Sequence, residues 1–267
     1  MSETTKTDFL LDIKNLSMSF GGLKAVNDLS FDIKKNEIVG LIGPNGAGKT
    51  TVFNCITQFY KEKMGTILFE NKNNVITNLN DIHVENVIKE GLVRTFQNVE
   101  LIKDLSIIDN LLIGAHTMFR TGFIQNILRT RKSRIEERHY RMKALEILEF
   151  MKIDHLKDQY VAGQPYGILK KIGIARTLMS EPKLIILDEP AAGLNEQETE
   201  ELSRLIKEIR VTYNCSILLV EHDMGFVMGL CDRICAINFG KFLAMGAPSY
   251  IQSHPDVQEA YLGKDDE

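Results

Sequence analysis

The chain has 267 residues, of which 44% are hydrophobic and 25% are charged, and its net charge is −4 at pH 7. This composition is typical of a folded globular protein and excludes a mainly disordered chain. The acidic balance argues against a nucleic-acid partner. No apolar run approaches the roughly 20 residues that cross a bilayer, and the polar N-terminus does not look like a secretory signal, so we expect neither a signal peptide nor a membrane span.

The four cysteines fall inside apolar segments and show no Cys-x-x-Cys spacing. We interpret them as reduced core thiols of a cytosolic protein. A zinc or disulfide role stays open, and Cys231 and Cys235 are the best-placed pair for it. The other two are Cys55 and Cys215.

The first part of the chain alternates short apolar runs with turn residues, a pattern that predicts strands. The predicted strands are Phe9–Asn15, Leu29–Ile33, Glu37–Ile42 and Gly65–Phe69. A Gly21-Gly22 turn separates the first two, and a helix at Lys49–Thr57 follows the third after a glycine-rich loop. We expect the N-terminal strands to form a separate antiparallel layer.

The middle of the chain carries helical apolar spacing at Ile107–Gly114 and Glu136–Met151. A basic stretch, Arg129–Arg134, lies between them. This stretch either contacts a membrane surface or a permease, or it is a solvated loop, and we favour the loop. We expect a helical subdomain near residues 98–178 that is inserted into the rest of the fold.

Strands and helices alternate over the last part of the chain. The predicted elements are a strand at Lys183–Leu187, a helix at Glu196–Arg210, a strand at Cys215–Val220, a helix at Phe226–Leu230 and a strand at Arg233–Asn238. This order predicts one α/β domain over residues 1–267 with a mainly parallel sheet as its core.

One segment matches the phosphate-binding pattern G-x-x-x-x-G-K-[ST] at every fixed position: Gly43-Pro44-Asn45-Gly46-Ala47-Gly48-Lys49-Thr50. Its glycines allow backbone N–H groups to converge on phosphate oxygens, and the start of the following helix directs its positive end at the same anion. Lys49 adds a charge near the β- and γ-phosphates, the Thr50 hydroxyl can bind Mg²⁺, and Thr51 is next to it in the nucleotide site. The alternative, a glycine turn with a chance lysine, is disfavoured by the position between a strand and a helix. The sequence therefore predicts binding of ATP or GTP.

A second motif supplies acidic groups. The apolar strand Leu184–Leu187 delivers Asp188 and Glu189 at its C-terminal end, where ligands bind in parallel sheets. We expect Asp188 to hold Mg²⁺ through water and Glu189 to accept a proton from the attacking water. A strand that ends in Asp-Glu is otherwise often a simple turn, but the phosphate loop favours the functional interpretation.

With these two motifs the sequence resembles the ATPase subunits of ABC transporters, a family of P-loop NTPases. Arg94-Thr95-Phe96-Gln97 is similar to the family's glutamine loop, which makes Gln97 a sensor of Mg²⁺ and nucleotide. Ala192-Gly193-Leu194-Asn195 stands where the D-loop belongs. His222 corresponds to the switch histidine that senses the γ-phosphate, and Phe20 to the aromatic residue that stacks on adenine. Alone, each of these two residues would be a structural residue, but their order and spacing favour the functional role.

Several segments are similar to one subfamily, the ATP-binding subunits of branched-chain amino acid importers. They are Gly91–Asn98, Asp109–Leu112, Asp188–Asn195, Val220–Met224, His254–Val257 and Ala260–Gly263. The resemblance covers nearly the whole chain, from Leu11 to Gly263.

The signature segment departs from the family pattern. The family usually has Leu-Ser-Gly-Gly-Gln and the subfamily often has Leu-Pro-Tyr-Gly-Gln, whereas this chain has Gln164-Pro165-Tyr166-Gly167-Ile168. A helix start near Tyr166 and Gly167 can still present a backbone N–H to a phosphate, so both remain nucleotide-binding candidates. Glu196, where Pro is usual, is a smaller difference. We expect ATP binding to be intact and closure and hydrolysis to be the steps that these changes affect.

The resemblance implies a peripheral subunit at the cytoplasmic face of the cell membrane that uses ATP and Mg²⁺ to energise an importer. Its implied partners are transmembrane permease subunits, a second ATPase subunit, identical or related, and indirectly a solute-binding protein. Two ATPase subunits would stack head to tail, with each phosphate loop facing the Tyr166–Ile168 region of the other. The alternatives are a related transporter for urea, amides or lipid export, and a regulatory nucleotide-binding subunit with weak hydrolysis. A single chain without a long coiled coil argues against a family member that acts on ribosomes or DNA.

Overall fold

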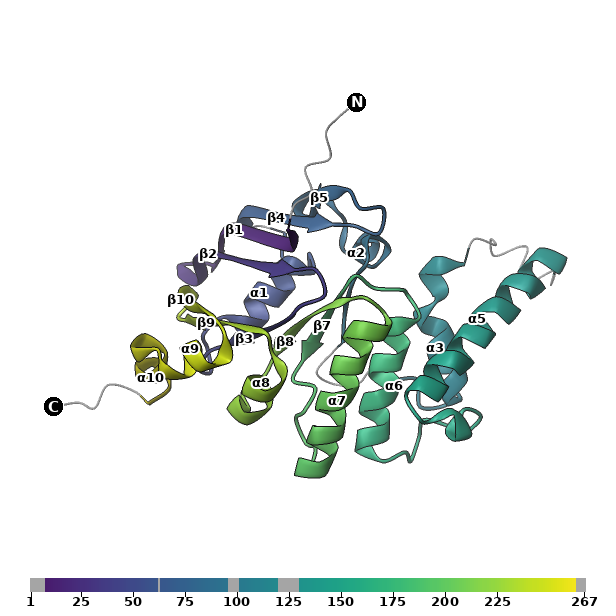
Figure 1. The fold of residues 1–267 in the computed structure, drawn as a ribbon. Coiled ribbons are helices and arrows are strands. Elements are labelled where there is room, and N and C mark those ends of the chain that lie inside the picture. Colours follow the sequence, from purple (N-terminus) through teal and green to yellow (C-terminus); the bar gives the residue numbers. More distant parts are fainter. Residues whose placement is uncertain (1–7, 62, 96–100, 120–129, 263–267) are drawn as a thin grey trace.

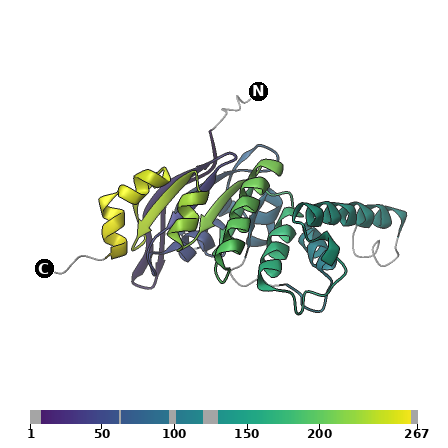
Figure 2. The same cartoon turned by 60° about the horizontal axis from the view of Figure 1, so that its bottom comes forward.

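The computed structural model describes residues 8–61, 63–95, 101–119 and 130–262. Two β-sheets form the body of the molecule, and a group of helices extends from one end of it (Figure 1 and Figure 2). The N-terminal antiparallel layer and the mainly parallel sheet that the sequence predicts are both confirmed.

The N-terminal sheet has four antiparallel strands in the order β2-β1-β4-β5. Its strands are β1 (Phe9–Phe20), β2 (Leu23–Lys34), β4 (Lys63–Glu70) and β5 (Ile76–Asn78). β1 and β2 are longer than predicted. Asn15 and Asp28 have positive φ angles, and the register shifts nearby, so the apolar alternation breaks although the strands continue.

The main sheet has six strands in the order β10-β9-β3-β8-β7-β6, and every neighbouring pair is parallel except β9 with β10. The strands are β3 (Ile38–Ile42), β6 (Leu92–Arg94), β7 (Leu184–Asp188), β8 (Ser216–Val220), β9 (Arg233–Asn238) and β10 (Lys241–Gly246). The carboxyl ends of the parallel strands share one edge, so Ile42, Asp188 and Val220 end at the same edge of the sheet. The loops that carry the candidate functional residues begin at this edge.

Helices connect and cover these strands. They are α1 (Lys49–Ile56), α2 (Val84–Glu90), α3 (Ile107–Gly114), α5 (Arg131–Phe150), α6 (Tyr166–Leu178), α7 (Glu196–Thr212), α8 (Met224–Leu230), α9 (Pro248–Ser253) and α10 (Pro255–Leu262), with 3-10 turns at Leu79–Asp81, His116–Met118 and Asp154–Leu156. None of the helices in the described ranges combines the length and the apolar character that a bilayer crossing requires. The sequence prediction omitted β5, β6, β10, α2, α9 and α10. Of these, β5 and β6 have only three residues each, too few to show a period.

Helices α3, α5 and α6 lie together beyond the edge of the main sheet, and α3 contacts both of the others. α5 extends furthest from the sheets (Figure 2). It begins at Arg131 because the Thr130 hydroxyl accepts the Ser133 N–H at 3.3 Å and caps the helix. The loop interpretation is therefore wrong for residues 131–134, which form the first turn of α5, while Arg129 lies outside the described residues.

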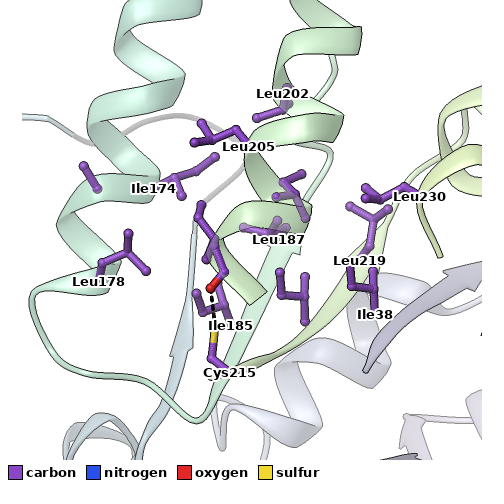
Figure 3. Packing of buried hydrophobic residues seen from close by; sticks show 14 of the residues in the cluster. Ile38, Ile174, Leu178, Ile185, Leu187, Leu202, Leu205, Cys215, Leu219 and Leu230 are labelled. Atoms are coloured by element: carbon purple, nitrogen blue, oxygen red, sulfur yellow. Dashed lines mark hydrogen bonds between the residues drawn. The ribbon is translucent and has the colours of Figure 1, made fainter. Parts of the chain in front are cut away.

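Two hydrophobic cores lie on opposite faces of the main sheet. On one face Ile185 and Leu187 pack with side chains of α6, α7 and α8, including Leu205 (Figure 3). On the other face Leu184 and Ile186 join the core between the two sheets, which α1 fills. Burial on both faces explains why the strands read as continuous apolar runs rather than alternating ones.

All four cysteines are buried free thiols. Burial raises the pKa of Cys55 to about 11 and that of Cys235 to about 12, so both are protonated near neutral pH. Cys231 and Cys235, the pair left open by the sequence, are not joined by a disulfide.

Candidate functional site

The phosphate loop connects β3 to α1 and is shaped by its glycines. Gly48 directly precedes α1 with φ 101°, and Gly46 has φ 81°, angles that favour glycine. A Cβ atom at Gly43 would collide with the carbonyl oxygen of Ile237, and one at Gly48 with that of Ala25. The backbone therefore approaches neighbouring strands more closely than any other residue would allow.

The predicted loop residues differ in how far they are exposed. Asn45, Gly46 and Thr50 are exposed, Pro44, Gly48, Lys49 and Thr51 are half-buried, and Gly43 and Ala47 are buried. The loop is closed by a hydrogen bond from the Ala47 N–H to the Pro44 carbonyl at 3.1 Å. The first N–H groups of α1 lack intrahelical acceptors and carry the positive end of the helix dipole, so the exposed loop suits an anion.

Lys49 folds back over the loop. Its Nζ donates to the carbonyl oxygens of Gly43 at 2.6 Å and Pro44 at 3.0 Å. Burial lowers the pKa of Lys49, and the negative charge of Glu189 opposes this effect. The lysine ammonium and the Glu189 carboxylate therefore lie close enough to interact, as the sequence prediction requires.

Asp188 is the last residue of β7 and is buried. Its Oδ2 accepts a hydrogen bond from Arg94 Nη2 at 2.6 Å, and its backbone N–H donates to Thr95 Oγ1 at 3.4 Å. A carboxylate at Asp188 and a hydroxyl at Thr50 are oxygen donors of the kind that Mg²⁺ prefers, so the residues present fit a magnesium ion. Arg94 was not among the predicted site residues.

Glu189 and His222 meet at the carboxyl edge of the main sheet. The Glu189 Oε1 lies 3.7 Å from the His222 Nδ1, and the His222 side chain is 63% exposed. The backbone of Glu189 has φ 47°, and its N–H donates to the Val220 carbonyl at 2.9 Å. Its carbonyl accepts a hydrogen bond from Lys170 Nζ at 3.1 Å. These bonds hold an unusual backbone conformation that aims the carboxylate out of the sheet edge.

Glu221 is a buried acid that the sequence prediction missed. Its Oε1 accepts the Ala191 N–H at 2.7 Å and its Oε2 accepts the His222 N–H at 3.2 Å. Burial raises the pKa of Glu221, and the two backbone hydrogen bonds oppose this effect. Glu221 therefore ties the segment after Glu189 to the segment that carries His222. The only sequence signal for a role of Glu221 was its position next to the predicted site residue His222.

Phe20 and Gln97 complete the predicted nucleotide residues. Phe20, at the end of β1, is 43% exposed and meets the ring of Tyr60 edge to face, with 5.1 Å between ring centroids. Its exposed face remains available to a flat partner, and Tyr60 is a neighbour that the sequence did not point to. Gln97 lies outside the described residues.

The signature segment lies beside the D-loop of the same chain rather than beside the phosphate loop. Tyr166 begins α6, and a Cβ atom on Gly193 would lie 3.0 Å from its ring. Gly167 lies next to the carboxylate of Glu198. Ile168, where the subfamily often has Gln, is half-buried and packs against the core. The substituted residue thus fills apolar space.

The D-loop residues Ala192–Asn195 lead into α7 through a capping box. The Asn195 Oδ1 accepts the Glu198 N–H at 3.0 Å, and the Glu198 carboxylate accepts the Asn195 N–H at 3.0 Å. Glu196 is the first helical residue, and its negative charge interacts favourably with the positive end of the helix dipole. The replacement of the usual Pro by Glu is therefore compatible with the helix start.

The C-terminal part of the chain supports the phosphate loop. The Gly240 N–H donates to the Ala47 carbonyl at 2.9 Å. Tyr261 of α10 lies against the loop, where burial raises the pKa of its phenol and a hydrogen bond from the Gly43 backbone opposes this effect. The sequence prediction used the tail only as a resemblance and gave it no place at the site.

Comparisons with known proteins agree with this geometry. Residues 26–192 match the family described as ABC transporter, and residues 243–267 match the family described as branched-chain amino acid ATP-binding cassette transporter. The high-affinity branched-chain amino acid transport ATP-binding protein LivG of Escherichia coli is 43% identical, with 96% of this chain and 98% of that protein covered. The corresponding protein BraF of Pseudomonas aeruginosa is 40% identical over the same shares.

Solved structures of ATP-binding cassettes are also similar to this chain. The ADP conformation of MJ1267, an ATP-binding cassette of an ABC transporter, superposes with a TM-score of 0.82 at 30% identity and covers 97% of this chain and 100% of its own. The predicted fold class, an α/β P-loop NTPase of the ABC ATPase type, is thereby confirmed. This chain belongs to the ABC transporter family of ATP-binding proteins.

Proposed function

We propose that this chain binds and hydrolyses ATP as a subunit of an importer of branched-chain amino acids. The observation that carries the proposal is that the phosphate loop, Glu189 and His222 each follow a parallel strand of the main sheet at its shared carboxyl edge, with 3.7 Å between Glu189 Oε1 and His222 Nδ1. The proteins LivG and BraF are named for branched-chain amino acid transport, and the C-terminal residues match a family with the same substrate class.

The phosphate loop binds the triphosphate. Backbone N–H groups of Gly46 and of Gly48 to Thr51 donate to phosphate oxygens, and the N-terminus of α1 adds the helix dipole. Lys49 gives up its two carbonyl partners and moves its ammonium to the β- and γ-phosphates. Phe20 stacks on the adenine base with its exposed face.

Glu189 and His222 act on the terminal phosphate. A water molecule attacks the γ-phosphorus in line with the bond to the β,γ-bridging oxygen, that bond breaks, and ADP leaves. The Glu189 carboxylate orients this water and accepts its proton. His222 donates a hydrogen bond to the γ-phosphate, and its contact with Glu189 links the sensing of that phosphate to the position of the base.

Thr50, Asp188 and Gln97 would hold a magnesium ion. Bound there, Mg²⁺ neutralises charge on the β- and γ-phosphates. The Thr50 hydroxyl and the Asp188 carboxylate are the donors within the described residues, and Gln97 is assigned by resemblance.

The subunit works in an assembly. Two ATPase subunits stack head to tail, so that Tyr166 and Gly167 of one face the phosphate loop of the other. They act with transmembrane permeases and, indirectly, a solute-binding protein at the cytoplasmic face of the membrane. Helices α3, α5 and α6 belong to the helical subdomain that the sequence predicts near residues 98–178, and this subdomain moves relative to the sheets when the two nucleotides are enclosed.

Reconstitution of the complex tests the proposal. The chain is purified with its permeases and second ATPase, placed in lipid vesicles, and supplied with the solute-binding protein and Mg²⁺-ATP. We expect ATP-dependent leucine uptake together with leucine-stimulated phosphate release, and loss of both with Glu189→Gln. Hydrolysis coupled to urea or amide uptake instead of leucine would overturn the substrate assignment. A complex that binds ATP without turnover would overturn the hydrolytic role.

A further inference from the structure

Arg94 lies between Asp188, the carboxylate expected to hold Mg²⁺, and α1, the helix that follows the phosphate loop. It is the last residue of β6, the edge strand, and is paired in register with Ile186 of β7. The Thr95 N–H continues this pairing by donating to the Ile186 carbonyl at 2.9 Å. This register places the guanidinium just beyond the end of β7, where Asp188 begins the candidate site.

Among the described residues, the guanidinium contacts Asp188 of β7 and two side chains of α1. Nη2 donates to Asp188 Oδ2 and Nη1 donates to Asn54 Oδ1, both at 2.6 Å. The guanidinium carbon lies 5.7 Å from the ring centre of Phe53. The side chains of Arg94 and Asp188 are only 12% and 9% exposed. A buried charge pair with hydrogen-bond partners on both sides is a fixed arrangement rather than a transient surface contact.

Asn54 and Phe53 belong to α1, the helix that begins at the phosphate loop. Asn54 follows Thr50 by four residues, so the two side chains share one face of the helix. Arg94 thus connects the strand that carries the metal-side carboxylate with the helix that carries the metal-side hydroxyl. Within the described residues, the Arg94 bond ends on Oδ2 of Asp188, and no side chain bonds Oδ1.

We infer that Arg94 is a positioning residue that fixes Asp188 relative to the phosphate-loop helix so that its second oxygen can serve the Mg²⁺ of bound nucleotide. This inference rests on the proposed function. The guanidinium is suited to the task because its planar fork can bond Asp188 and Asn54 at once, which a lysine ammonium cannot do with the same geometry. Arg94 also lines a cavity of about 270 Å³ between β6, α3 and α6, so movements of those helices would reach Asp188 through it.

The test measures the magnesium requirement of nucleotide binding. ADP is the probe because it is not hydrolysed, and its stabilisation of the chain is followed by thermal melting in EDTA and across a titration of Mg²⁺. For Arg94→Ala we expect the Mg²⁺ concentration at half-maximal effect to rise about tenfold or more, the usual scale for loss of a group that orients a metal ligand. The affinity for ADP in EDTA should stay within about twofold of the wild type, because Lys49 and the loop are untouched.

Three further variants keep the test decisive. Arg94→Lys should recover part of the effect because it keeps the charge and loses the fork, and Asn54→Ala should give a smaller shift because it removes only the anchor on α1. Arg204→Ala, which removes an arginine whose side chain is 69% exposed and pairs with Glu200 on the same helix, is the matched control and should change nothing. If Arg94→Ala does not fold, the other variants carry the test.

The outcomes separate the two claims. An unchanged Mg²⁺ requirement in the Arg94 and Asn54 variants would overturn the positioning role. A lower requirement would overturn it as well, because Arg94 would then compete with the metal. If the wild-type chain shows no Mg²⁺-dependent stabilisation by ADP, the proposed function fails before Arg94 is considered.

Discussion

The phosphate loop and the signature segment are two glycine-containing segments at helix starts, yet the chain holds them in different ways. Gly43 and Gly48 are enclosed by backbone carbonyls of other strands, and Lys49 is bonded to the loop itself. Gly167 meets only the flexible carboxylate of Glu198, and Tyr166 is 45% exposed. The first segment is completed within one chain, whereas the second presents an open surface. This difference explains how the signature sequence can change while the phosphate loop keeps every fixed residue.

The largest expected effect is on the rate of ATP hydrolysis, and it comes from a residue outside both segments. Glu189→Gln should leave ATP bound and slow hydrolysis by about 10² or more, because the side chain can no longer accept a proton. Phosphate release by the assembled complex measures the rate, and ATP-induced thermal stabilisation measures binding. Turnover close to that of the wild type would remove Glu189 from the role of base.

The two glycines provide a direct test of the comparison. Gly43→Ala should lower the free energy of unfolding by about 2 kcal/mol, because the new Cβ meets a backbone carbonyl that cannot move aside. Gly167→Ala should lower it by about 1 kcal/mol or less, since the Glu198 side chain can move aside and only its capping hydrogen bond to the Asn195 N–H is lost. Urea unfolding of both variants measures the difference. Equal losses would show that the two segments are held alike.

Removal of the Lys49 charge should weaken the binding of ATP to the isolated chain. Lys49→Ala should weaken ATP binding about tenfold or more, the scale of a lost hydrogen bond to a charged group. Loss of ATP-induced thermal stabilisation is the measurement. Lys170→Ala is a useful control, because among the described residues this lysine bonds the Glu189 carbonyl and does not bond the phosphate loop. Its ATP affinity should stay near that of the wild type.

The smallest effect is expected at the signature segment. Tyr166→Ala should leave ATP affinity of the isolated chain unchanged and lower hydrolysis by the complex about threefold, the scale of a lost cation–π contact with Lys170. Titration of ATP against the isolated chain and phosphate release by the complex measure the two quantities. A loss of affinity in the isolated chain would place Tyr166 at its own nucleotide site and contradict the head-to-tail arrangement.

Much of the fold and of the candidate site could be predicted from the local sequence. The phosphate loop, the strand that ends in Asp188 and Glu189, and the strand before His222 each combine an apolar run with a motif, so their types and ends were predictable. The long hairpin of β1 and β2 was underestimated because Asn15 and Asp28 interrupt the alternation.

Other features depend on the tertiary structure. Glu221 lies next to His222 and Arg94 lies three residues before Gln97, but their contacts with Ala191 and Asn54 are ones that no spacing rule reveals. Tyr261 approaches Gly43 from the other end of the chain. The edge strand β6 has only three residues, too few for a periodic signal.

The most direct test of the central claim is an experimental structure of the Glu189→Gln variant with ATP and Mg²⁺. We expect the γ-phosphate between Lys49 Nζ and the side chain at position 189, at hydrogen-bond distances of about 3 Å, with the metal ion beside Thr50 and Asp188. A triphosphate bound away from Lys49, or held with the residue 189 side chain far from the γ-phosphate, would contradict it.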